Sequence, residues 1–149
     1  MHIVITRPKE DSIQLFEKLH KLGYITTHLP VIKIEKLETK KINLESYEAV
    51  IFTSSNAIRF MNIEKFNLKI KCFCVGGSTE LTAKQAGFIN TYYSEGTVDS
   101  LIELIIRTLD NKSGKLLYLS SEFISKDLDL DLINEGYSVD RVSNYTSLP

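Results

Sequence analysis

The sequence of 149 residues has no tryptophan, few prolines and glycines, and no excess of either charge. Its formal net charge of −1 gives no support to a nucleic-acid partner, which would favour a basic chain. No apolar run approaches the roughly 20 residues of a membrane helix, and the N-terminal apolar run is too short for a signal peptide. We therefore expect no nucleic-acid or membrane partner, and a cytoplasmic location is the default.

Cysteine and histidine are also scarce. Cys72 and Cys74 are separated by one residue within a strand pattern, so their side chains are expected on the same face. Because no second cysteine pair or nearby histidine accompanies them, the ligands of a metal site are missing. Buried, reduced cysteines are the favoured interpretation, and a redox or metal role is the alternative. The three histidines, His2, His20 and His28, are scattered and are expected on the surface.

The remaining composition is that of an ordinary globular domain, with 43% hydrophobic and 25% charged residues. Short apolar runs alternate with segments of helical period. Strands are expected at 2–6, 25–29, 31–35, 48–52, 71–75, 91–93, 115–119 and 138–143, with helices at 13–22, 57–61, 81–86, 98–109 and 124–134. The polar segments 36–46 and 62–69 are expected to be a linker and a loop. This alternation predicts an α/β fold with a parallel sheet covered by helices on both faces.

Small polar residues follow three of the predicted strands. They are Thr53, Ser54 and Ser55, then Gly76, Gly77, Ser78 and Thr79, and finally Ser120 and Ser121. Ligands of open α/β sheets bind beyond the carboxyl ends of the strands, and helix N-termini there favour anions. The same residues also serve as simple helix caps and capping turns. Binding and capping both stay open at this stage.

Two other positions offer chemistry. Arg7 follows the first strand, where its side chain points into a ligand crevice or forms a surface ion pair. Tyr145 lies past the last strand, as a core or interface aromatic or as a proton donor. A group of charged residues is expected on a solvated helix face: Lys126, Asp127, Asp129 and Asp131.

The chain also contains an internal similarity. Moving residue 23 onto residue 136 aligns the first strand-helix-strand segment with the last one, without a gap. The shared dipeptide is Gly23-Tyr24 over Gly136-Tyr137, and Leu15 falls on Leu128. Any two β-α-β units align in a general way, but the shared Gly-Tyr favours a true duplication.

Several motifs together resemble the uroporphyrinogen-III synthase family. They are Ile5–Pro8, Leu29-Pro30, Ile51–Ala57, Val75-Gly76 with Thr79, and Gly136-Tyr137 followed by Tyr145-Thr146. The resemblance implies a flavodoxin-like three-layer parallel sheet in each of two lobes, joined by a two-stranded linker. It places an incomplete first lobe at 1–30, a linker strand at 31–36, a complete second lobe at 37–143 and a returning linker strand at 144–149.

Family members continue past the equivalent of Pro149, so we expect part of the first lobe to be absent from this chain. One β-α-β unit cannot bury its helix face and both strand edges by itself. Residues 1–30 are therefore expected to pack on a partner copy or on a missing fragment, or to stay loosely ordered. A homodimer or a domain swap through residues 1–30 is our hypothesis.

The resemblance implies a lyase of haem biosynthesis. Its substrate is hydroxymethylbilane, a linear tetrapyrrole, which it cyclises to uroporphyrinogen III with loss of water and inversion of the last pyrrole ring. No cofactor and no metal are implied. By resemblance, Tyr145 is the acid near the leaving hydroxyl group. The expected substrate-binding residues are Arg7, Thr53, Ser54, Ser55, Gly76, Gly77, Ser78, Thr79 and Ser120, although many members carry Arg or Gly at the Ser120-Ser121 corner.

Two other classes of function remain open. The second lobe alone could be a tetrapyrrole-binding module without catalysis, because the facing lobe is incomplete. An unrelated flavodoxin-like or receiver-like regulatory domain is the other possibility. A receiver needs paired acidic residues after its first strand, whereas the strand ends here read Thr6-Arg7-Pro8 and Thr53-Ser54-Ser55.

Overall fold

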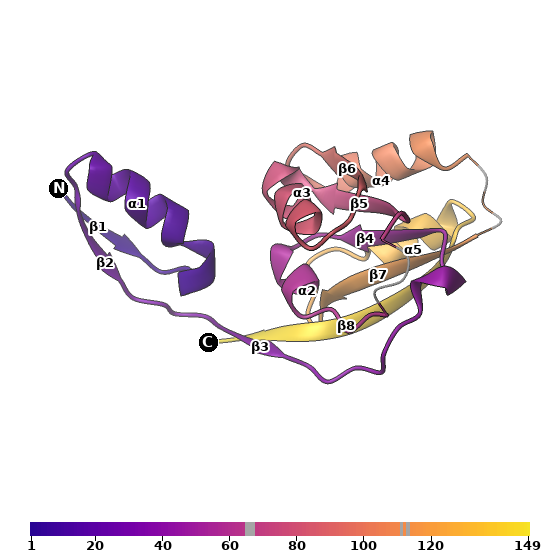
Figure 1. The fold of residues 1–149 in the computed structure, drawn as a ribbon, viewed down its shortest axis with the longest axis horizontal. Coiled ribbons are helices and arrows are strands. Elements are labelled where there is room, and N and C mark those ends of the chain that lie inside the picture. Colours follow the sequence, from indigo (N-terminus) through magenta and orange to yellow (C-terminus); the bar gives the residue numbers. More distant parts are fainter. Residues whose placement is uncertain (65–67, 111, 113) are drawn as a thin grey trace. The chain divides into compact units, whose positions relative to one another are not determined.

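The computed structural model, drawn as a ribbon in Figure 1, describes residues 1–64, 68–110, 112 and 114–149. The predicted loop 62–69 thus lies partly outside the described residues. The chain forms two compact units, one of 1–35 with 147–149 and one of 36–146. The boundary crosses two strands, β3 (Lys33–Lys36) and β8 (Ser138–Leu148).

The first unit contains the predicted strand-helix-strand segment. β1 (His2–Ile5) and β2 (Ile25–His28) pair in parallel, with His2 opposite Ile25. A short 3₁₀ turn, η1 (Lys9–Asp11), leads into α1 (Ile13–Lys21). The helix ends at Gly23, whose φ of 80° is the left-handed conformation that glycine adopts without strain.

The apolar residues of this unit are poorly covered. No residue of α1 is buried, and Ile5 is the one hydrophobic residue of β1 and β2 that is. The exposed apolar side chains of the unit include Val4, Ile13, Leu15, Leu22, Ile25, Leu29, Val31 and Ile32. The hydrophobic effect therefore stabilises this unit only weakly.

The second unit is built on an extended parallel sheet. The strand order of the six-stranded sheet is β3-β8-β7-β4-β5-β6. All pairs from β8 to β6 are parallel, which confirms the predicted α/β fold. The inner strands are β4 (Ala49–Phe52), β5 (Lys71–Val75) and β7 (Lys115–Ser121), with β6 (Asn90–Ser94) at the far edge.

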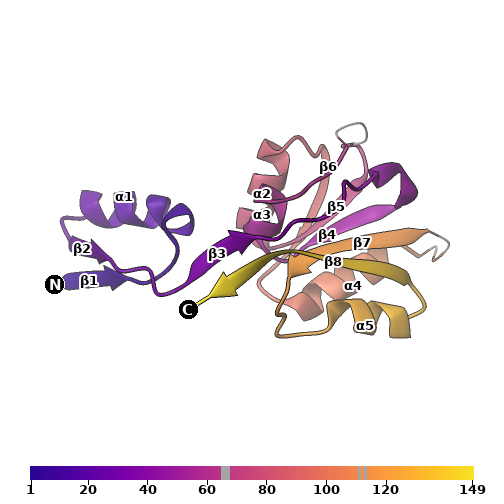
Figure 2. The same cartoon turned by 90° about the horizontal axis from the view of Figure 1, so that it is seen from below.

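Helices cover both faces of this sheet, as Figure 2 shows: α2 (Ser55–Arg59) and α3 (Gly76–Gln85) lie on one side, and α4 (Val98–Thr108) and α5 (Leu128–Asn134) on the other. β4 is buried along its whole length. The core below α4 and α5 consists of Ala49, Ile51, Phe73, Leu101, Ile105, Leu109, Leu116, Tyr118, Leu128, Leu132 and Tyr137. Cys72 and Cys74 are buried free thiols, as predicted.

Two helix starts are fixed by side-chain caps. Ser54 Oγ accepts a hydrogen bond from the Asn56 backbone N–H at 3.2 Å, so Ser54 is the cap of α2. Thr97 Oγ1 accepts from the Ser100 backbone N–H at 3.1 Å and caps the start of α4. Both caps lie at the carboxyl edge of the sheet.

Several predicted elements differ from the structure. The helix expected at 81–86 already begins at Gly76. The last helix begins at Leu128 and not at residue 124, because Ser121 Oγ accepts from the Phe123 N–H at 3.3 Å and stabilises a turn there. β8 joins the predicted last strand at 138–143 and the returning linker strand expected at 144–149 in one continuous strand. The segment 36–46 is no polar linker: Leu44 is buried within η2 (Leu44–Ser46), which Asn43 caps.

The two β-α-β segments share their local hydrogen bonds. The Tyr24 N–H donates to the Leu19 carbonyl at 3.1 Å, and the Tyr137 N–H donates to the Leu132 carbonyl at 3.0 Å. Gly136, with a φ of 96°, ends its helix as Gly23 does. Tyr137 is buried and its hydroxyl donates to the Leu109 carbonyl, whereas Tyr24 is exposed. The duplication stays a prediction, supported by this common geometry.

Truncation of an apolar side chain should reduce the free energy of unfolding by different amounts in the two β-α-β segments. Leu128→Ala removes a side chain with no exposed surface, so we expect a loss of about 2–5 kcal/mol in the free energy of unfolding. Leu15→Ala changes the aligned position, which is 42% exposed, and should stay within about 0.5 kcal/mol. Urea unfolding followed by circular dichroism measures both, and equal losses would contradict the difference in burial.

Candidate functional site

The carboxyl edge of the second unit's sheet holds a cavity of about 240 Å³. Its polar lining comes from three strand ends and one loop: Thr53, Ser54, Tyr118, Ser121, Ser125, Lys126 and Tyr145. Val98 at the start of α4, with Phe123 and Ile124, supplies apolar walls. The structure thus brings Thr53, Ser54 and Tyr145 of the predicted site residues together at one place.

The position of this cavity follows from the sheet topology. β4 lies between β5 and β7. The chain leaves β4 toward β5 and β6 on one side and later returns to β7 and β8 on the other side. Connections that diverge in this way leave a crevice at the carboxyl ends of the two central strands. The cavity lies at this switch point, between the ends of β4 and β7.

Tyr118 is the most enclosed polar group of the lining. Only 2% of the residue is exposed, and its hydroxyl lies 3.4 Å from Thr53 Oγ1. Burial raises the pKa of the Tyr118 phenol, while the hydrogen bond to Thr53 and the charge of Arg141 oppose this rise. Tyr118 is therefore held as a neutral phenol that can donate or accept a hydrogen bond.

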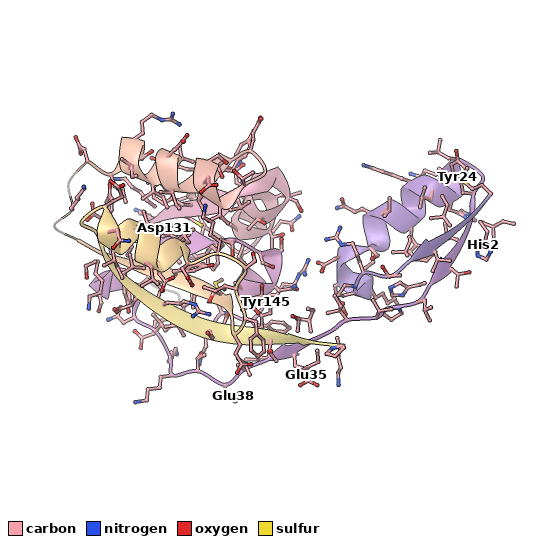
Figure 3. All side chains as sticks on the ribbon, turned by 180° about the vertical axis from the view of Figure 1, so that it is seen from behind. His2, Tyr24, Glu35, Glu38, Asp131 and Tyr145 are labelled. Carbon is pink, nitrogen blue, oxygen red and sulfur yellow. The ribbon has the colours of Figure 1, made fainter. Side chains whose placement is uncertain are left out.

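Tyr145 reaches the cavity from β8, where Figure 3 labels it. The residue is 8% exposed, and its ring centroid lies 6.5 Å from that of Phe60. A register shift between Ser120 and Ser121 pairs Ser121 with Tyr145. The Glu122 N–H donates to the Tyr145 carbonyl at 2.9 Å. On the same strand, Asn144 Nδ2 donates to the Ala57 carbonyl at 2.7 Å, which ties β8 to α2.

Ser120 lies beside the cavity but is not part of its lining. It is fully buried, and its hydroxyl accepts from Arg141 Nε at 2.9 Å and donates to the Ser121 carbonyl at 2.9 Å. Arg141 Nη2 also donates to the carbonyls of Ser121 and Glu122. This network fixes the turn after β7, so the structure gives Ser120 a supporting place and not a cavity-facing one.

The remaining predicted site residues of the second unit lie outside the cavity. Gly76, Gly77, Ser78 and Thr79 form the first turn of α3, where Thr79 is buried. Thr82 Oγ1 donates to Ser55 Oγ and to the Ser78 carbonyl, each at 3.2 Å. The corners after β4 and β5 are therefore linked through Thr82, a residue that the strand-end pattern does not include.

Arg7 belongs to the first unit, where it is exposed just after β1. Its carbonyl oxygen accepts a hydrogen bond from the His28 ring at 2.7 Å. His2 and His20 are exposed and His28 is half-buried. Within the described residues, no group of three or more His, Cys, Asp or Glu side chains could hold a metal ion. None of the described helices is long and apolar enough to cross a membrane.

Of the lining residues that the sequence analysis missed, Tyr118 and Lys126 carry the most chemistry. Tyr118 lies inside a buried strand and carries no sign of a site, except that it precedes Ser120 by two positions and so shares its side of the sheet. Lys126 was expected on a solvated helix face, but it precedes α5 and lines the cavity. The wrong helix start caused this error, because a helix from residue 124 would have turned Lys126 into an ordinary surface position.

Known proteins are similar to the chain along most of its length. Residues 13–149 match the family described as uroporphyrinogen-III synthase HemD. The porphyrin biosynthesis protein HemD of Ruminiclostridium josui is 28% identical, over 97% of this chain and 32% of the relative. A putative uroporphyrinogen-III synthase of Methanocaldococcus jannaschii is 38% identical, over 56% of this chain and 36% of the relative.

Solved structures show the same fold. A uroporphyrinogen-III synthetase of Helicobacter pylori matches with a TM-score of 0.65 and 18% identity, over 98% of this chain and 61% of its own. A mutant uroporphyrinogen III synthase of Thermus thermophilus matches with a TM-score of 0.61 and 17% identity, over 100% of this chain and 63% of its own. This chain spans about a third of the curated relatives and about three fifths of the solved ones.

The raised pKa of Tyr118 makes a prediction about pH. A phenol whose pKa is higher in the folded state contributes stability below about pH 10, the unfolded value, and loses it as the pH rises through the folded value. Tyr118→Phe should therefore reduce the loss of stability between pH 8 and pH 11, measured as urea midpoints. Tyr93→Phe, at an exposed position on β6, is the control and should follow the unchanged protein.

Proposed function

The chain belongs to the uroporphyrinogen-III synthase family, and we propose that the cavity between the ends of β4, β7 and β8 binds hydroxymethylbilane for cyclisation to uroporphyrinogen III. The observation that carries the proposal is the convergence of Thr53, Tyr118 and Tyr145 at this switch point. Hydroxyl and phenol groups at a partly apolar cavity suit a substrate that combines pyrrole rings with polar arms.

The substrate's carboxylates need hydrogen-bond donors more than a basic protein. The start of α4 borders the cavity through Val98, and a helix N-terminus favours negative charge. Thr53, Ser54 and Ser121 add hydroxyl groups. A chain of net charge −1 can therefore bind an anionic ligand at this edge of its sheet.

The chemical step needs little general acid–base catalysis from the protein. The terminal hydroxyl group leaves with the electron pair of its C–O bond, and it takes up one proton to become water. We assign this proton to the Tyr145 phenol. Inversion also breaks the bond between the last ring and its neighbouring bridge carbon and re-forms it at the other α-carbon of that ring. The proton lost from this newly bonded carbon returns to the Tyr145 phenolate. Holding the bilane so that the inverted last ring closes is the larger task, and it is one of positioning.

The other predicted residues have supporting or peripheral places in this proposal. Ser120 holds Arg141 and with it the turn that carries Ser121. Ser55 and the turn from Gly76 to Thr79 are proposed contacts for substrate arms that extend beyond the cavity. Arg7 is proposed as a contact contributed by the first lobe. The buried free thiols support the cytoplasm as the proposed compartment, because such thiols persist in a reducing environment.

The function is tested with freshly prepared hydroxymethylbilane and analysis of the product isomers. Formation of uroporphyrinogen III above the spontaneous rate would support catalysis by this chain. Formation of the type I isomer alone, with saturable ligand binding, would favour the alternative of a tetrapyrrole-binding module without catalysis. If the chain shows neither ligand binding nor type III product, the proposal is contradicted.

The role of Tyr145 is tested by Tyr145→Phe, which removes only the acidic hydroxyl. General acid catalysis contributes about 10²–10⁴-fold in typical cases, and since hydroxide loss is intrinsically easy here, we expect a fall in kcat near the lower limit. KM should change little. The exposed Tyr93→Phe serves as the matched control. An unchanged kcat in Tyr145→Phe would remove Tyr145 from the mechanism.

We also propose that the first unit is completed by a second copy of the chain, as a dimer or a domain swap. Its aligned counterpart in the second unit buries Leu128 and Tyr137 under α4, whereas Leu15 and Tyr24 are exposed. Apolar area of this kind favours association, since one β-α-β segment offers no cover for it.

Sedimentation or light scattering over a concentration series tests this assembly. The unchanged chain should approach twice its mass of 17.0 kDa. The double change Leu15→Glu and Leu22→Glu places charges at two exposed apolar positions, one in α1 and one at its C-cap, and should restore the monomer. A chain that is monomeric at every concentration would contradict the dimer.

A further inference from the structure

Lys126 is the one positively charged residue among the described residues that line the cavity. It lies in the loop between β7 and α5, two residues before the helix begins. Its ammonium group forms an ion pair with the Asp99 carboxylate, in the first turn of α4. This contact joins the loop that borders the cavity to the helix on its other side.

Asp99 faces a different hollow. Together with Ile102, Glu103, Asp131 and Glu135 it lines the groove between α4 and α5, which Lys126 does not line. The ion pair thus spans the ridge between an acidic groove and the cavity of the candidate site. Lys126 thus lines the cavity while its ammonium group is paired with Asp99 of the groove.

The pair is exposed, with 39% of the Lys126 side chain and 71% of the Asp99 side chain accessible to water. Ion pairs of this kind are weak, because water screens the charges and two long side chains lose rotational freedom. Breaking this pair therefore costs little. A carboxylate that entered the cavity would compete with Asp99 for the Lys126 ammonium on favourable terms.

We propose that Lys126 binds a carboxylate arm of the ligand in the cavity, and that Asp99 holds Lys126 at the rim until the ligand replaces it. This inference rests on the proposed function, since it assigns one arm of the polycarboxylate substrate to one residue. Thr53, Ser121 and Tyr145 supply neutral donors, and Lys126 supplies the single charge. Asp99 tunes affinity without touching the ligand.

Anaerobic isothermal titration of the full chain with uroporphyrinogen III tests the assignment. Lys126→Gln should weaken binding by about tenfold, the usual size of one lost charge-assisted contact. Lys126→Arg should keep most of the affinity. Asp99→Asn should strengthen binding by about twofold to fivefold, because the competitor of the ligand is lost. In the Lys126→Gln background, Asp99→Asn should have no effect.

Two matched controls separate these effects from changes in net charge. Lys115→Gln removes a lysine of similar exposure that pairs with Asp140 at 3.5 Å, at the start of β7 and away from the cavity. Glu103→Gln removes a carboxylate from α4, one turn beyond Asp99, in the same acidic groove. Both should bind like the unchanged chain.

The outcomes distinguish this inference from the function on which it rests. If the unchanged chain does not bind uroporphyrinogen III, the assignment of Lys126 is overturned, and the isomer analysis with hydroxymethylbilane decides the proposed function separately. If it binds and Lys126→Gln binds equally well, the assignment of Lys126 fails while the proposed function stands. Weaker binding of uroporphyrinogen III by Asp99→Asn would also overturn the assignment. The same holds if Lys115→Gln loses as much affinity as Lys126→Gln.

Discussion

A parallel sheet must be covered on both faces, and the two units of the chain meet this requirement to different degrees. In the second unit, helices on both sides leave no exposed residue in β4, and this rigid centre aligns the polar residues at the carboxyl ends. The first unit has the same strand-helix-strand motif but only one helix. The cavity therefore belongs to the unit in which the requirement is satisfied.

The site illustrates how such an arrangement makes chemistry from ordinary residues. Serine, threonine and tyrosine are unremarkable along the sequence, and none carries a metal or a strong charge. Their effect comes from convergence, since β4 and β7 end at the same edge and the register shift beside Ser121 pairs Tyr145 of β8 with Ser121. Burial then keeps the Tyr118 phenol protonated, so that the cavity offers neutral donors and acceptors.

Much of this could be predicted from the sequence. Periodic apolar runs predicted the alternation of strands and helices, and the strand ends pointed to Thr53 and Ser54 through a general property of parallel sheets. The sequence analysis did not identify Tyr118 and Lys126 as site residues, for two different reasons. Tyr118 lies within a buried strand, where an aromatic residue is usually core. The expected place of Lys126 followed from a helix predicted to begin at residue 124. The turn at Ser121 delays the start of that helix by four residues, to Leu128. Local turn chemistry of this kind is weakly encoded, whereas period and burial are strongly encoded.

The strand order of the second unit has a consequence for how the chain is assembled. The neighbouring strands of the sheet are β8-β7-β4-β5-β6. If β7 and β8 are counted as strands 1 and 2, and β4, β5 and β6 as strands 3, 4 and 5, this order is 2-1-3-4-5. That is the strand order of flavodoxin, so the unit is a circular permutant of that fold. Its chain enters through β3 and leaves through β8, and these two strands are neighbours in the sheet. A domain whose entry and exit are adjacent can be inserted into a host without separating the host's broken ends. The second unit, with β3 and β8 side by side, has the form of such an insert.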